Sequence, residues 1–103
     1  MEGISHEMLG ANTRSELADL EHILQKNLRK KIMDSGATLI DPNTVYFSVD
    51  TQIGKDVVIY PNVYFGEKVI VEDNVKILPY SYLERVHLKK GDIIGPFAGH
   101  KQK

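Results

Sequence analysis

The side chains best suited to catalysis or metal binding are few and scattered in this sequence of 103 residues. It has four histidines, His6, His22, His87 and His100, and no cysteine. No two of these histidines show the close helical or strand spacing of a zinc site, and the lack of cysteine removes thiolate chemistry and disulfides. We therefore predict no catalytic residue in this chain.

The charge balance argues against polyanionic partners. Thirteen Lys and Arg stand against 14 Asp and Glu, a formal net charge of −1, so no overall field favours nucleic acid or an anionic membrane. We interpret the short basic run Arg29-Lys30-Lys31 as a solvated helix end. No segment approaches the roughly 18 apolar residues of a membrane span, and the N-terminus lacks a signal-peptide core. We expect a cytoplasmic chain with neither nucleic acid nor membrane as a partner.

One amphipathic helix is predicted over residues 12–36, after a flexible segment at 1–11. A Thr13 and Glu16 pair forms a capping box at its start, and Gly36 follows its last apolar position. Intervals of three and four place its apolar residues on one helical face. These residues are Leu17, Leu20, Leu24, Leu28 and Ile32.

From Leu39 onward the apolar pattern repeats every six residues, which is neither a helical period nor simple strand alternation. Extended triplets such as Val57-Val58-Ile59 alternate with triplets of turn residues such as Tyr60-Pro61-Asn62. The outer two side chains of an extended triplet share one face and are nearly always apolar, so we predict that they point inward. Very short strands joined by corners at fixed spacing are typical of a β-solenoid.

The prolines indicate how many sides each coil has. Pro42, Pro61, Pro79 and Pro96 are separated by 19, 18 and 17 residues, so one corner returns after about three units of six. We predict a three-sided prism of about three coils, in which the repeat loses one residue after Leu83. This step predicts three inner columns: Val45 over Val63 over Ser81, Phe47 over Phe65 over Leu83, and Ile59 over Ile77 over Ile94.

The same step places Tyr46, Tyr64 and Tyr82 in one column on the outside of the prism. A contiguous aromatic strip on a surface often marks a contact region. Two interpretations are equally open: the rings form an interface between subunits, or they pack against the chain's own helix. Both predict that this side of the prism is covered.

The chain resembles a known family. The six-residue repeat, the preceding helix, the phrase "LIDPNTVYF" and the later "IGPFA" are together similar to the middle of the bacterial bifunctional N-acetylglucosamine-1-phosphate uridylyltransferase and glucosamine-1-phosphate acetyltransferase. The resemblance runs from about Gly10 to Ala98. It implies a homotrimer and a mainly β fold: a short hexapeptide-repeat left-handed parallel β-helix of about three coils, preceded by one long α-helix. The corresponding parts are a linker helix at 12–36, the β-helix at 37–98 and a C-terminal tail at 99–103.

The phrase "GANTRSELADLEHIL" resembles the end of the uridylyltransferase domain in that family. There an asparagine before the connecting helix helps to hold a catalytic magnesium and the nucleotide sugar, and Asn12 takes its place here. An amide oxygen is a reasonable ligand for magnesium. On the residues alone, Asn12 is better explained as a helix cap. We expect no magnesium to bind to this chain by itself.

Most catalytic elements of the family have no counterpart in these residues. Nothing before Gly10 resembles a glycine-rich triphosphate loop, and Gly99 stands where the family has its first arginine for the sugar phosphate. We therefore expect a truncated relative without independent catalysis, which a companion catalytic polypeptide could complete. The alternative is a non-enzymatic β-helix module that trimerises or docks on a partner. A small acyltransferase built around His87 is a third and weaker hypothesis.

Overall fold

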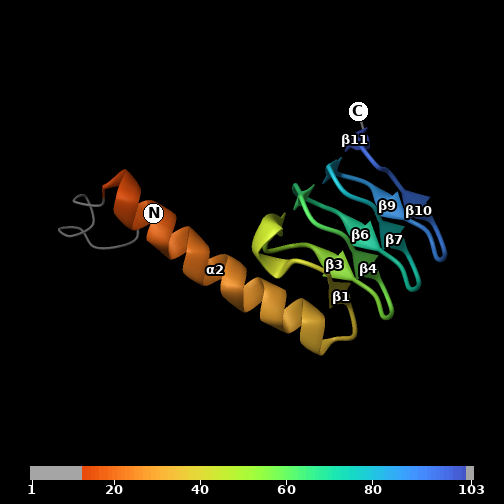
Figure 1. The fold of residues 1–103 in the computed structure, drawn as a ribbon, viewed down its shortest axis with the longest axis horizontal. Helices are drawn as coiled ribbons and strands as arrows, with labels where there is room; N and C mark the ends of the chain where they lie inside the picture. Colours follow the sequence, from red (N-terminus) through yellow and green to blue (C-terminus); the bar gives the residue numbers. More distant parts are fainter. Residues whose placement is uncertain (1–12, 102–103) are drawn as a thin grey trace.

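The structure is a computed structural model that describes residues 13–101, apart from the side chains of the last two residues. A long helix leads into a compact body of short strands (Figure 1). The elements are α2 (Arg14–Asp34), β1 (Thr38–Leu39), η1 (Pro42–Thr44), β2 (Val45–Tyr46), β3 (Gln52–Ile53), β4 (Val58–Ile59), β5 (Val63–Phe65), β6 (Ile70–Val71), β7 (Lys76–Ile77), β8 (Ser81–Glu84), β9 (His87–Leu88), β10 (Ile93–Ile94) and β11 (Gly99–Lys101).

The strands form three parallel sheets, one on each side of a solenoid. Their strand orders are β1-β4-β7-β10, β11-β8-β5-β2 and β3-β6-β9, so each strand pairs with the strand one coil away. The stacked coils are visible side by side in Figure 1. This is a solenoid of about three turns, as the six-residue repeat predicts, and its architecture is consistent with a hexapeptide-repeat left-handed β-helix.

The predicted inner columns are confirmed. Val45 pairs with Val63 and Val63 with Ser81, Phe65 pairs with Leu83, and Ile59 pairs with Ile77, which pairs with Ile94. The Phe47 ring stacks on the Phe65 ring with 4.9 Å between centroids. Ser81 is the one polar member, and its hydroxyl donates to the Leu78 carbonyl at 2.8 Å, so the inward hydroxyl is satisfied.

The loss of one residue from the repeat is also confirmed. Ile70 pairs with His87, a step of 17 residues, whereas Gln52 pairs with Ile70 at a step of 18. Corner residues with positive φ recur every six residues through Asp56, Asn62, Lys68, Asn74 and Tyr80, and the next follows after five, at Arg85. The missing residue therefore lies in the side of the prism that contains β8.

The first coil differs from the predicted pattern. Leu39 pairs with Ile59, a step of 20, because η1 inserts two extra residues before β2. The inward residues of this side are therefore Ala37 and Leu39, both buried, rather than Leu39 and Asp41. At the other end, the predicted tail at 99–103 is partly a strand, since β11 pairs with β8 and extends the solenoid beyond residue 98.

Helix α2 begins and ends close to the predicted positions. Thr13 is the N-cap, and its hydroxyl and the Glu16 carboxylate form the predicted capping box, with bonds of 3.1 and 2.8 Å. Gly36, at a φ of 113°, turns the chain into β1. The predicted flexible segment at 1–11 lies outside the described residues.

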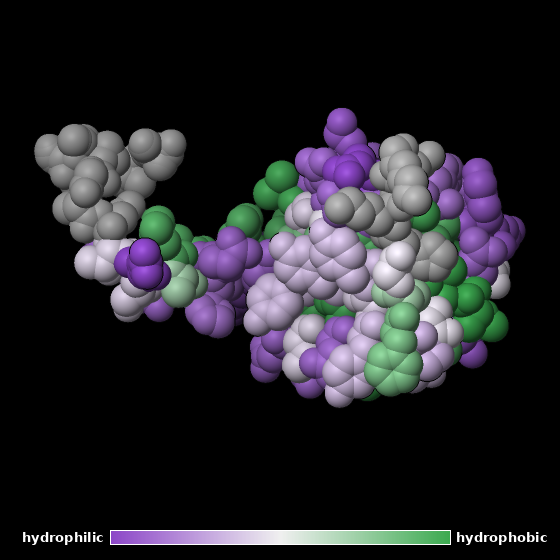
Figure 2. Space-filling model, turned by 90° about the horizontal axis from the view of Figure 1, so that it is seen from above, coloured by the Kyte–Doolittle hydropathy of each residue, from purple (hydrophilic) through white to green (hydrophobic). Residues whose placement is uncertain are grey.

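The apolar stripe of α2 is only partly used. Ile32 is buried against the first coil and Leu28 packs beside it, but Leu17 and Leu20 are each about half exposed. The helix runs away from the solenoid (Figure 1), and hydrophobic groups lie between hydrophilic ones along its projecting part (Figure 2). No helix in the described part of the chain combines the length and apolar character that a membrane crossing needs.

Candidate functional site

The three tyrosines that the repeat predicts to align form a continuous column on the outer face of the β2-β5-β8 side. Tyr46 pairs with Tyr64 and Tyr64 with Tyr82 in the strand register. Their rings are stacked, with centroids 6.4 Å apart for the first pair and 5.4 Å for the second. The parallel register sets this alignment, because it places residues one coil apart directly above one another.

The helix covers only the first ring of the column. The guanidinium carbon of Arg29, on α2, lies 5.0 Å from the centre of the Tyr46 ring, which is half-buried. Tyr64 and Tyr82 keep 51% and 41% of their surface exposed. Packing against the chain's own helix therefore accounts for Tyr46 and leaves two stacked rings open. Whether they form an interface stays a prediction.

The far end of the column is fixed by a carboxylate. The Tyr82 hydroxyl donates to Glu84 Oε1 at 2.8 Å, and this bond, with smaller contributions from desolvation and the carboxylate charge, raises the pKa of the Tyr82 phenol. Arg85 in turn donates to Glu67 and Glu84. The exposed edge of the Tyr82 ring therefore carries a neutral hydroxyl next to the ion pairs of Arg85. This surface is both polar and aromatic, which suits a contact with another protein.

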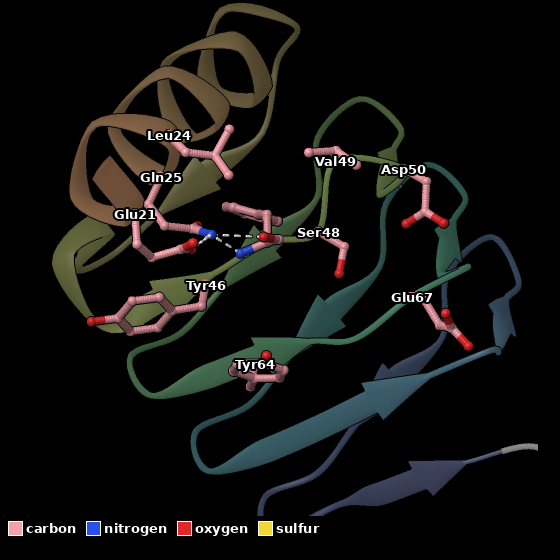
Figure 3. Close-up of a pocket in the computed structure, with 10 residues that line it drawn as sticks. Glu21, Leu24, Gln25, Tyr46, Ser48, Val49, Asp50, Tyr64 and Glu67 are labelled. Carbon is pink, nitrogen blue, oxygen red and sulfur yellow. Dashed lines mark hydrogen bonds between the residues drawn. The ribbon is translucent and has the colours of Figure 1, made fainter. Parts of the chain in front are cut away.

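Two polar side chains of α2 close the edge of the first coil. Gln25 donates to the Phe47 carbonyl at 2.8 Å and accepts from the Phe47 amide at 2.9 Å, as the dashed lines in Figure 3 show for the residues drawn. Arg29 Nε donates to the Val45 carbonyl at 2.9 Å. Both side chains are buried. They take the place of a neighbouring strand beside β2, whose edge would otherwise leave unpaired backbone groups.

Sequence reasoning missed these two residues. It assigned Arg29 to a solvated helix end, which is wrong because the side chain is 8% exposed and bonded to the solenoid backbone. The available signal was spacing: Gln25, Arg29 and Ile32 lie four and three residues apart, so they share the helical face that meets the solenoid.

A groove lies beside the tyrosine column, between α2 and the first two coils (Figure 3). Its volume is about 410 Å³. The helix contributes Glu21 and Leu24, and Glu21 also accepts a hydrogen bond from Gln25 at 2.8 Å. The remaining walls carry aromatic, small and acidic side chains from the solenoid: Tyr46, Phe47, Ser48, Val49, Asp50, Tyr64 and Glu67.

Known proteins are similar in sequence to this chain. A family described as bacterial transferase hexapeptide (six repeats) matches residues 50–85. The bifunctional protein GlmU of Azorhizobium caulinodans is 52% identical over 92 residues, 89% of this chain and 20% of that protein. The sequence is thus similar to GlmU over most of its own length. GlmU of Paramagnetospirillum magneticum is 52% identical over 97 residues, 94% of the chain and 22% of that protein, and the Wolbachia pipientis wMel protein is 50% identical over 91 residues, with 88% and 21% covered.

The chain spans about a fifth of the length of these relatives. The alignment covers the helix and the coils together, as the resemblance to the bifunctional sugar-nucleotide enzyme predicts. The chain is therefore related to that bifunctional enzyme over a short segment.

Within the part of the chain that the structure describes, the chemically active side chains do not gather in one site. His87 is exposed and its Nε2 lies 2.7 Å from Glu72 Oε2. The Lys90 amide, which donates to the same carboxylate, and His87 lower the pKa of Glu72. His22 lies on α2, and His100 lies in β11 by its backbone. Among residues 13–101, no three His, Cys, Asp or Glu side chains are placed to hold a metal.

The predicted substrate and magnesium residue, Asn12, lies outside the described residues, as does His6. The alternative role of Asn12 as helix cap is wrong, because Thr13 occupies the N-cap position. Gly99, which the resemblance predicts to stand at the position of an arginine, lies in β11 and pairs with Tyr82.

Proposed function

We propose that this chain contributes the linker helix and first β-helix coils of a GlmU-type enzyme of UDP-N-acetylglucosamine synthesis, and that these coils assemble subunits into a homotrimer. The observation that carries the proposal is the stacked tyrosine column, of which Tyr64 and Tyr82 remain about half exposed. Identity of about 50% to GlmU proteins over nine-tenths of the chain supports it.

The shape and chemistry of this face favour contact with a second copy. The column and the neighbouring groove form one surface that combines aromatic rings with Glu21, Asp50 and Glu67. Aromatic side chains are enriched in protein interfaces because they bury large areas at low entropic cost. A heterologous contact, in which this face of the prism meets a different surface of its neighbour, can close into a ring around a threefold axis.

The assembly proposal is tested by two alanine variants. Tyr64→Ala removes the central ring of the column, whereas Lys76→Ala removes an outward side chain of another sheet. We expect Tyr64→Ala to raise the dissociation constant of the assembly by about tenfold or more, as removal of a buried interface aromatic does. Lys76→Ala should leave it unchanged. Equal effects of the two changes would eliminate the column as the interface.

We further propose that these 103 residues do not catalyse either transfer alone. Glycine at position 99 cannot supply the charge that the family's arginine gives to the sugar phosphate, and the His87 imidazole is held by Glu72 on the surface. In this proposal a companion catalytic polypeptide supplies the missing groups, and magnesium, if Asn12 helps to bind it, binds only with that companion. The cytoplasm, where the sugar nucleotide is made, is the proposed location.

The proposed lack of catalysis is tested by pyrophosphate release from UTP and N-acetylglucosamine-1-phosphate, with and without magnesium. We expect no release above the background of the uncatalysed mixture. Magnesium-dependent turnover by the purified chain would contradict the proposal, and would not affect the assembly claim because the two measurements are independent.

A non-enzymatic docking module is the second candidate. It is favoured by the exposed apolar side chains on the projecting part of α2, including Leu17, Leu20 and Ile23. It predicts that Leu20→Ser weakens capture of a partner chain and leaves self-association unchanged. If the same substitution weakened the homotrimer, these side chains would belong to the subunit interface instead.

A further inference from the structure

Arg29 is a buried cation with no carboxylate partner among the described residues. Its side chain is 8% exposed, Nε donates to the Val45 carbonyl, and its guanidinium lies over the Tyr46 ring. The ion pairs of residues 13–101 involve other side chains, and no hydrogen bond of its terminal nitrogens joins it to those residues. A buried charge without a counter-ion is costly, so an anion beside it would be stabilising.

Arg29 also lines a cavity between α2 and η1, separate from the tyrosine groove. This cavity has a volume of about 460 Å³. Its basic side chains come from consecutive turns of one helical face, and its remaining walls are Met33, Pro42 and Asn43. Within residues 13–101, no carboxylate lines it. The basic residues are His22, Lys26, Arg29 and Lys30.

The cavity retains most of its positive charge. Lys30 forms an exposed ion pair with Asp34, with 2.9 Å between Nζ and the carboxylate oxygen. Lys26 makes no hydrogen bond or ion pair within residues 13–101, and Arg29 donates only to a neutral carbonyl there. Lys26, Arg29 and Lys30 are three neighbouring cations, and among the described residues a carboxylate pairs with only one of them. Their net positive charge attracts a doubly charged anion more strongly than a singly charged one.

We propose that this cavity is a binding site for a phosphomonoester. A phosphoryl group carries close to two negative charges at neutral pH and presents three acceptor oxygens, which suit a guanidinium and an ammonium together. Met33 and Pro42 provide an apolar wall for the organic part of the ester, and the Asn43 amide can donate to a polar group on it. The site does not depend on the proposed assembly or on catalysis.

The probe is phenyl phosphate, titrated into the full chain by calorimetry, with inorganic phosphate and benzoate as comparison ligands. We expect saturable binding of one phenyl phosphate per chain. Inorganic phosphate should bind about threefold more weakly because it leaves the apolar wall uncovered, and benzoate about tenfold more weakly because it carries a single charge.

Two variants and a matched control locate the site. Arg29→Lys keeps the charge and loses the planar fork, and should weaken phenyl phosphate about tenfold. Lys26→Gln changes an exposed side chain that makes no bond to residues 13–101, and should weaken binding about threefold. Lys76→Gln, an equal change of charge on the solenoid, should have no effect. Circular dichroism of each variant checks the fold.

The phosphomonoester site is supported if the three ligands and the three variants show the relative affinities given above. The proposal is overturned by no saturable binding up to about 10 mM, well above the millimolar range of weak sites. It is also overturned if inorganic phosphate or benzoate binds as tightly as phenyl phosphate, or if Lys26→Gln and Lys76→Gln weaken binding equally. These outcomes leave the trimer proposal untouched, because Tyr64 does not line the cavity.

Discussion

The interior of the solenoid and its junction with α2 are stabilised by different kinds of side chain. Inside the solenoid, aliphatic and aromatic residues stack in columns, and Val57, Ile59, Val75 and Ile77 are fully buried. At the junction, the polar Gln25 is 3% exposed and makes two hydrogen bonds to the backbone at Phe47, while Arg29 makes one at Val45.

The difference follows from the backbone hydrogen-bonding groups that need partners in each of the two regions. Within the solenoid, the backbone groups of one coil bond to the next coil, so the side chains need only fill space. At the first coil, one edge of β2 has no neighbouring strand within the described residues, and its backbone groups need donors and acceptors. Helix α2 therefore ends the solenoid by supplying polar atoms as well as the apolar Ile32.

The largest expected effect tests the interior. Ile77→Ala removes a fully buried side chain from the centre of one column, and should lower the free energy of unfolding by about 3 kcal/mol through lost burial and a cavity. The matched control is Ile70→Ala, on the outer face, which should cost under about 1 kcal/mol. Urea unfolding at one fixed protein concentration measures both. Similar losses would mean that the inner columns do not dominate stability.

A smaller effect tests the junction. Gln25→Ala leaves the buried Phe47 amide and carbonyl without their partner, and should cost about 2 kcal/mol. Gln52→Ala, at an exposed position on β3, should be close to neutral. Native-state hydrogen exchange should show faster exchange of the Phe47 amide in Gln25→Ala. If that amide stays equally protected, the helix does not take the place of a strand.

This contrast explains what the sequence predicts about the fold. The columns through Ile59, Phe65 and Ser81 follow from a six-residue repeat, because the same backbone geometry recurs in every coil. The step of 20 residues between Leu39 and Ile59 does not follow from the repeat, because η1 occurs once and interrupts it. The roles of Gln25 and Arg29 also escape a hydrophobic pattern, because they depend on which backbone groups the solenoid edge leaves unpaired.

The candidate site shows the same division. The tyrosine column is predictable because Tyr46, Tyr64 and Tyr82 repeat with the coil. The extent to which α2 covers these tyrosine rings is not predictable from the sequence, because the helix direction depends on the turn at Gly36 and on contacts with the first coil. The basic cavity adds a second case: its cations are spaced along α2, but part of its apolar wall comes from Pro42, beyond the turn.

The smallest expected effect tests a contact between coils. The Lys90 amide first, and then His87, lower the pKa of Glu72 below its ordinary value of 4.5. The folded state therefore binds this proton less readily than the unfolded state, so the contribution is present above about pH 4.5 and is lost as the pH falls through the folded pKa. Glu72→Gln should reduce the acid sensitivity of unfolding in this window.

The control for this experiment is Asp19→Asn, which changes an exposed carboxylate on α2 that has no hydrogen bond within residues 13–101. Its unfolding should keep the pH dependence of the parent chain between about pH 3 and 5, the range in which carboxylates titrate. An unchanged profile for Glu72→Gln would show that the ionisation of Glu72 is not linked to the folding of these coils.

The central claim is that the coils in this chain assemble subunits, and sedimentation equilibrium of the purified chain over a wide concentration range tests it most directly. The account predicts a single species with the mass of three chains, which dissociates at lower concentration and dissociates sooner in Tyr64→Ala. A chain that remains monomeric at every concentration would contradict the claim, because the exposed rings of Tyr64 and Tyr82 would then have no partner copy.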